Sequence, residues 1–309
     1  MQKYSDLKIG ISFTASWAWG ISLGIGHTML RTRGLIPFSV WAICNIFSLL
    51  FFGWFVKRNP VFINITKNSL VKVFLMITQI YAIWINTRIM AQYLSTGTIY
   101  GDLLAGMVTL VVMLATFKGK LHFSILSDQW QYAVMVIGLT VVAILGYKNG
   151  DIRFIKMAAN SDLGWGLWMG AGILMAPFHN AMYFQREEQT TSFRPYWIHT
   201  AAFGLYMLLV GITGIFDYKW SNILTSIIII AITTSSQDSA VAAMQYLIGD
   251  KWTVIICLVL LLSWPLSRTA QAINVWELYQ TARIFIILPL IIYYWRWGRS
   301  IKKLRKHIY

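Results

Sequence analysis

The stretch GWGLWMGAGILMAPFHN, residues 164–180, places four glycines, a proline and two polar side chains inside an apolar segment. The stretch GISFTASWAWGISLGIG, residues 10–26, carries glycines at a similar density. Glycine and proline both weaken a helix, so each stretch predicts a membrane helix that is interrupted. The alternative is that both residues are simply common in membrane helices.

The composition requires a membrane protein. Of 309 residues, 57% are hydrophobic and only 12% are charged, whereas soluble domains carry about 25% charged residues. A soluble enzyme, a secreted disulfide scaffold and a disordered chain are therefore excluded. Ten segments approach the ~20 apolar residues that a membrane helix needs. They are residues 9–30, 35–56, 70–94, 97–117, 123–147, 164–185, 195–216, 221–247, 252–267 and 272–298.

The two interrupted stretches open the two halves of this series, 9–147 and 164–298. Interrupted helices at corresponding positions are typical of transporters built from inverted repeats, with a site near the bilayer midplane. We therefore expect an all-α polytopic protein with a single membrane domain, 1–309, that ends in a basic tail at 299–309.

The net charge of +15 has a membrane explanation. If the N-terminus is cytoplasmic, 17 of the 26 Lys and Arg residues fall on the cytoplasmic side, 7 fall outside, and Arg88 and Arg283 fall within spans. This bias predicts that both termini are cytoplasmic. The partners that we expect are the lipid bilayer and a small solute, and no nucleic acid.

Residues 233–239, TTSSQDS, are seven consecutive polar residues inside the eighth apolar segment. Serine and threonine can bond back to their own helix, but seven polar residues are hard to explain by packing, and they predict an ion or solute site. Hard cations such as Na⁺ prefer carbonyl, hydroxyl and carboxylate oxygens. An unwound first helix and the Ser235–Ser236 pair would supply such oxygens together.

Two further polar clusters allow two interpretations each. Asp128, near the start of the fifth segment, is either an ion ligand or a helix cap. At the end of the sixth segment, Arg186 and Glu187 are predicted to face the cytoplasm as an interfacial anchor, and His179 to be a core histidine. The sequence contains no phosphate loop, nucleophile elbow, dinucleotide fingerprint or Cys/His cluster, so nothing in it argues for an enzyme.

Four short motifs resemble the sodium/solute symporter family in family order. They are Ser12-Phe-Thr-Ala-Ser-Trp17, Ser127-Asp128-Xaa-Xaa-Gln131, Tyr183-Phe-Gln-Arg186 and Ser235-Ser236-Gln-Asp238-Ser239. The resemblance implies a LeuT fold of two inverted five-helix repeats with broken first and sixth helices. Ser16-Trp-Ala-Trp19 and residues 34–41 look most like the urea active transporter branch. Unlike most family members, the chain is expected to comprise the ten-helix core alone.

The resemblance also implies the site residues. It assigns one sodium ion to the carbonyls of Ala15, Ala18 and Ile232 and the hydroxyls of Ser235 and Ser236. A second ion would use Asp128, Ser235, Asp238 and Ser239, although Asp238 could instead carry a proton. The solute would lie between the first, third, sixth and tenth spans, with candidates Trp17, Trp19, Ser22, Gln79, Phe178, Asn180, Tyr183 and Gln280.

The function expected from these residues is sodium-coupled transport of a small neutral polar solute by alternating access. An aromatic box with amide and hydroxyl partners and no excess charge suits such a solute. Urea is the first candidate, and a sugar or a neutral amino acid is the second. A membrane receptor or accessory protein on the same fold, and a passive channel, are the alternatives from other functional classes.

Overall fold

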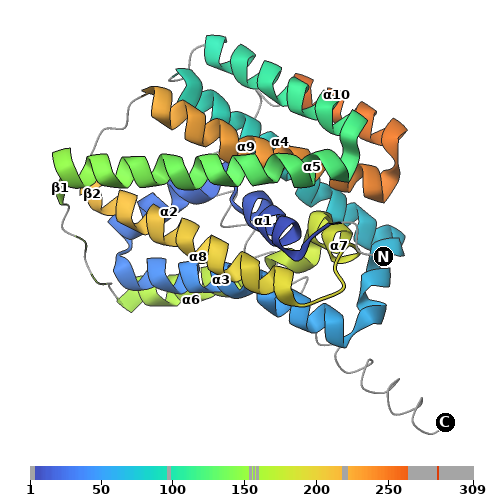
Figure 1. Cartoon of the computed structure of the whole chain (residues 1–309), viewed down its shortest axis with the longest axis horizontal. Coiled ribbons are helices and arrows are strands. Elements are labelled where there is room, and N and C mark those ends of the chain that lie inside the picture. Colours follow the sequence, from blue (N-terminus) through green and yellow to red (C-terminus); the bar gives the residue numbers. More distant parts are fainter. Residues whose placement is uncertain are drawn as a thin grey trace, which may run out of the picture.

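Helices dominate the computed structural model, which describes residues 4–95, 99–152, 155, 157, 160–217, 222–263 and 284 (Figure 1). The α-helices are α1 (Asp6–Trp17), α2 (Gly20–Thr32), α3 (Leu35–Arg58), α4 (Ser69–Ser95), α5 (Ile99–Asn149), α6 (Asn160–Met175), α7 (Ala181–Glu187), α8 (Arg194–Ile215), α9 (Asn222–Ile248) and α10 (Asp250–Ser263). Two 3-10 segments, η1 (Pro60–Lys67) and η2 (Ala176–His179), and two short strands, β1 (Asp151–Ile152) and β2 (Phe216–Asp217), complete the described elements.

Nine of the ten predicted spans overlap described helices. Within the described part of the chain, five helices are long and apolar enough to cross a membrane, or six if α1 and α2 form one span bent by 61°. The 51-residue α5 contains the fourth and fifth predicted spans, which meet at Lys120, where the backbone leaves the helical region (φ 52°, ψ −144°). The tenth predicted span and the basic tail lie outside the described residues apart from position 284.

Both spans predicted to be interrupted are interrupted. The first span breaks between α1 and α2, and the sixth is divided into α6, η2 and α7. The packing of the helices repeats between the two halves: α1 and α2 of the first span pack on α8, which is the seventh, and α6 of the sixth packs on α3, which is the second. Such an exchange of partners is the pattern that two repeats related by a pseudo-two-fold axis produce.

Contacts between connections agree with the predicted order of crossings. Arg33 pairs with Asp162 at 3.0 Å, Lys57 with Glu187 at 2.8 Å and Lys120 with Asp250 at 2.9 Å. Strands β1 and β2, which follow the fifth and seventh spans, pair in antiparallel register. Each contact joins two connections that the alternation of ten spans places on the same side of the membrane.

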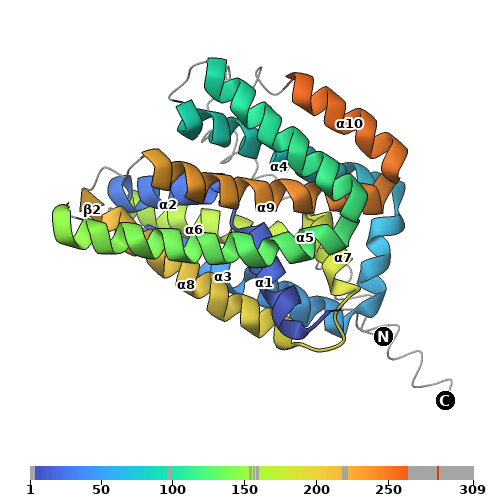
Figure 2. The ribbon, with the colours of Figure 1, turned by 45° about the horizontal axis from the view of Figure 1, so that its top comes forward.

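Helix α9 occupies the centre of the bundle (Figure 2). Within the most apolar 18 residues of α9, 89% are buried inside the protein, whereas the corresponding fraction for α5 is 28%. It packs against α4, α5, α7, α10, α1 and α2. The polar run 233–239 is buried throughout, so these side chains must find partners within the protein rather than in lipid.

Candidate ion and solute site

The break between α1 and α2 frees particular backbone carbonyls. In a continuous helix the amide of Trp19 would bond to the carbonyl of Ala15, and the amide of Ser22 to that of Ala18. Here Trp19 donates to the Trp17 carbonyl at 3.0 Å, and Ser22 donates to the Trp19 carbonyl at 2.8 Å. The Ala15 and Ala18 carbonyls, both in buried residues, have therefore lost their helical donors.

The break is held open by a side chain from α4. The Gly20 amide donates to Asn86 Oδ1 at 2.9 Å instead of to the Ser16 carbonyl. Gly20 also packs tightly, because a Cβ at this position would lie 2.6 Å from Thr233 Cγ2 and 3.1 Å from Asn86 Oδ1. The start of α2 is thus fixed against both α4 and α9.

The hydroxyls of α9 lie on the other side of the contact between α1 and α9. Ser235 and Ser236 are fully buried. The Ser235 hydroxyl donates to Asp128 Oδ1 at 2.6 Å, and the Ser236 hydroxyl makes a long 3.4 Å bond to the Ile232 carbonyl. Because Ser235 gives its proton to a carboxylate, the lone pairs of its oxygen remain available to a cation.

Asp128 is part of a buried network and is not a helix cap. It lies within α5, eight residues beyond the turn at Lys120, so the capping interpretation is wrong. Its Oδ2 accepts the Ser12 hydroxyl at 2.5 Å and an Arg186 Nη2 proton at 3.0 Å. This carboxylate therefore joins α1, α5, α7 and α9.

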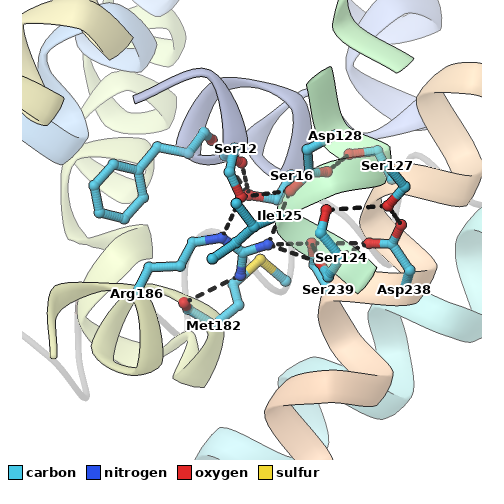
Figure 3. Close-up of polar contacts among 12 residues, drawn as sticks. Ser12, Ser16, Ser124, Ile125, Ser127, Asp128, Met182, Arg186, Asp238 and Ser239 are labelled. Carbon is cyan, nitrogen blue, oxygen red and sulfur yellow. Dashed lines mark hydrogen bonds and ion pairs between the residues drawn. The ribbon is translucent and has the colours of Figure 1, made fainter. Parts of the chain in front are cut away.

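The position of Arg186 differs from the one that the sequence predicts. It was expected at the membrane interface, but its side chain is fully buried, with Nε donating to Ser12 Oγ at 2.8 Å (Figure 3). Its Nη2 reaches Ser124 and Ser239 at 2.9 and 2.7 Å, in addition to Asp128. A buried guanidinium is tolerated only when it is paired and hydrogen-bonded, as this one is.

Glu187 is also buried rather than exposed to the cytoplasm. Its carboxylate pairs with Lys57 Nζ at 2.8 Å and accepts a hydrogen bond from Tyr196. The two residues at the end of α7 therefore enter two separate polar networks. The sequence did not predict these two networks, because charged residues at the end of an apolar segment look the same whether they lie at the membrane interface or form buried ion pairs.

Asp238 completes the polar network on α9. Its Oδ1 accepts from Ser124 at 2.9 Å and from Ser239 at 3.2 Å. Its Oδ2 accepts from Ser127 at 2.7 Å and from Gln131 at 3.3 Å. The four side chains proposed for a second ion, Asp128, Ser235, Asp238 and Ser239, are thus brought together. Arg186 lies among them, beside Asp128 and Ser239 (Figure 3).

The second break brings part of the predicted solute set together. Asn180 caps α7 by accepting the Met182 amide at 3.3 Å. Gln79 Nε2 of α4 donates to Asn180 Oδ1 at 3.0 Å, and Gln79 Oε1 is buried without a hydrogen-bond partner among the described residues. Tyr183 packs edge-on against Trp17, with 5.3 Å between ring centroids.

The remaining predicted solute residues lie elsewhere. Phe178 belongs to an aromatic cluster with Phe52, Phe55 and Phe62, at 5.2–5.8 Å between centroids. Trp19 packs near Tyr81 at 6.0 Å, and Ser22 donates to the Trp19 carbonyl at 2.6 Å. Gln280 is outside the described residues.

Sequence reasoning assigned no role to Asn86, which sets the geometry of the first break. One signal was present: Asn86 and Thr87 are adjacent polar residues within the third apolar segment. Polar groups at membrane depth are usually functional. Ser124 was missed as well, because a single serine near a helix start has an ordinary local explanation.

Comparison with known proteins supports the fold. No protein-family model and no curated protein sequence matches this chain. The structure is similar to that of a Na⁺-coupled sialic acid symporter, solved in a substrate-bound outward-open state that reveals a novel Na⁺ site. The match has a TM-score of 0.66 at 11% identity and covers 94% of this chain and 78% of the other. The chain therefore has a LeuT-type fold.

Proposed function

We propose that this protein is a secondary transporter that couples the uptake of a small polar solute to Na⁺. The observation that carries the proposal is the diversion of the amide donors of Trp19 and Ser22 away from the Ala15 and Ala18 carbonyls. Two freed carbonyls at the end of α1, and two buried hydroxyls on the neighbouring α9, form an oxygen set suited to a hard cation.

The coupling follows from the position of this site. A cation that binds the carbonyls of α1 and the hydroxyls of α9 stabilises one arrangement of the two helices over another, and so shifts the conformational equilibrium. Trp17, the last residue of α1, lies at the same break and packs on Tyr183 of the second interrupted span. The membrane potential adds about 2.3 kcal/mol per charge per 100 mV to the driving force.

The solute is proposed from the second break. Gln79, Asn180, Trp17 and Tyr183 provide amide and aromatic groups without an excess of charge, which suits a small neutral solute with hydrogen-bond donors. Urea is proposed because the motifs resemble the urea branch, and a sugar fits equally because the structural neighbour is a sialic acid symporter.

The test of the proposal is uptake by purified protein in proteoliposomes, with and without an inward Na⁺ gradient. Saturable uptake of labelled urea or of a sugar that requires the Na⁺ gradient supports it. Uptake that does not saturate indicates a passive channel, and no uptake of any solute in the panel, with protein that is correctly folded, favours a receptor or accessory protein. Either result contradicts the proposal.

The ion site is tested by the pair Ser235→Ala and Ser236→Ala, which removes both hydroxyl ligands. Losing such a ligand costs on the order of 1–3 kcal/mol, by analogy with a hydrogen bond to a charged group. We expect the Na⁺ concentration for half-maximal uptake to rise tens-fold. Thr140→Ala is the matched control, because that hydroxyl bonds only to its own helix at Val136 among the described contacts.

The solute proposal is tested by competition. Unlabelled urea and its close analogues should inhibit Na⁺-driven uptake of labelled urea, and Trp17→Ala or Tyr183→Ala should weaken that uptake. If a sugar or an amino acid moves and urea neither moves nor competes, the urea assignment is wrong while sodium coupling stands.

A further inference from the structure

The Arg186 guanidinium occupies the region that the family resemblance assigns to a second sodium ion. Its Nη2 donates to Asp128 Oδ2 at 3.0 Å and to Ser239 Oγ at 2.7 Å, and both residues belong to the proposed second-ion set. The side chain is fully buried, and α1, α5, α7 and α9 surround it (Figure 3). A permanent cation therefore already lies among these oxygens.

The oxygens around the guanidinium also have hydrogen-bond donors. Ser235 donates to Asp128 Oδ1, while Ser12 and Arg186 donate to Asp128 Oδ2. Both oxygens of Asp238 accept two hydrogen bonds each from neighbouring side chains. A sodium ion placed here would have to displace these donors and would also be repelled by the guanidinium. The residues present therefore do not fit a second sodium ion.

We propose that Arg186 is a built-in cation that replaces the second sodium, so that the protein binds one Na⁺ in each transport cycle. This inference rests on the proposed function. Every oxygen of Asp128 and Asp238 accepts at least one hydrogen bond from a neighbouring side chain, as in an ionised carboxylate. Two ionised carboxylates and Arg186 leave one net negative charge in the buried cluster. One sodium ion beside Ser235, which bridges to Asp128, neutralises that charge.

Ion counting on the unmodified protein is the first test. Equilibrium binding of ²²Na⁺ to purified protein should saturate at about one ion per chain, because the cluster leaves one negative charge uncompensated. Two bound ions overturn the inference and leave sodium coupling intact. No bound sodium overturns the proposed function itself, and the inference with it.

Substitution of Arg186 gives a second readout. Arg186→Gln leaves Asp128 and Ser239 without the guanidinium, so a second sodium should bind and the Hill coefficient of Na⁺-dependent uptake should rise from about 1 towards about 2. Arg186→Lys is the matched control and should keep the coefficient near its original value because the charge remains. A folded Arg186→Gln protein with an unchanged coefficient and an unchanged ion count contradicts the proposal.

A double variant separates charge from packing. Arg186→Gln combined with Asp128→Asn removes one charge of each sign, so the cluster again carries one net negative charge. We expect this protein to bind one ²²Na⁺ and to recover the shallow Na⁺ dependence. If it binds as many ions as Arg186→Gln alone, the charge of Arg186 does not set the ion count, and the inference is wrong.

Discussion

The two interrupted spans use their free backbone groups in different ways. Between α1 and α2 the backbone leaves the helical region at Ala18 (φ −76°, ψ 80°) and is extended at Trp19, which provides no capping side chain for α2. Between α6 and α7 the chain continues as the 3-10 segment η2, with a proline at its start, and Asn180 caps α7. The first break leaves carbonyls free, whereas the second satisfies its own amides.

This difference suggests a division of labour. The carbonyl end of a helix is the negative end of its dipole, so the end of α1 favours a cation. The second break instead presents side chains, with Tyr183 against Trp17 and Asn180 against Gln79. We therefore expect substitutions at the first break to change the dependence on Na⁺, and substitutions at the second break to change the dependence on solute.

The largest effect is expected from Gly20→Ala. The added methyl would lie 2.6 Å from Thr233 Cγ2 and 3.1 Å from Asn86 Oδ1, which separates α2 from α9 and disturbs the ion site. Overpacking of this kind costs about 1–3 kcal/mol, so the half-saturating Na⁺ concentration in proteoliposome uptake should rise tens-fold. Gly24→Ala is the control, because among the described residues its methyl would meet only Tyr93 Oη, at 3.8 Å.

A second substitution identifies the cause. Thr233→Ser removes the methyl that the new side chain of Gly20→Ala would meet, so the double variant should recover part of the Na⁺ affinity. Equal Na⁺ dependence in Gly20→Ala and Gly24→Ala would show that the start of α2 does not shape the ion site.

A smaller effect is expected from Asn86→Ala. The substitution leaves the buried Gly20 amide without its acceptor, and such a group costs about 1–3 kcal/mol. The half-saturating Na⁺ concentration should rise about tenfold, since 1.4 kcal/mol corresponds to a factor of ten. Thermal unfolding in detergent, followed by size-exclusion chromatography, shows how much of the loss is stability. An unchanged Na⁺ dependence would mean that Asn86 holds the fold and not the ion site.

The interrupted spans were predictable because their cause is local. Glycine and proline act on the backbone in which they stand, so 10–26 and 164–180 indicated breaks at the positions where α1 ends and α6 ends. The polar run 233–239 was predictable for a similar reason: no lipid-facing helix can carry seven polar residues. The structure buries this run at the centre of the bundle.

The environment of Arg186 could not be predicted in this way. Its burial depends on Ser12, Ser124, Asp128 and Ser239, which lie between 53 and 174 residues away along the chain. The local pattern, a basic residue at the end of an apolar segment, is the same for an interfacial anchor. The surroundings of Phe178 could not be predicted either, since an aromatic residue beside a break can face either the cavity or the core.

The smallest effect is expected from Asn180→Ala at the second break. It removes the cap of α7 and the partner of Gln79, and loss of an N-cap costs about 0.5–2 kcal/mol. Asn180→Ser retains an oxygen that can accept the Met182 amide, so it should unfold at a higher temperature than Asn180→Ala. Both variants should need a few-fold more solute for half-maximal uptake, because both lose the amide group that bonds Gln79. Neither should change the half-saturating Na⁺ concentration, which depends on the first break. A shift in Na⁺ dependence as large as that of Asn86→Ala would show that the two breaks form one site, and the division of labour would then be wrong.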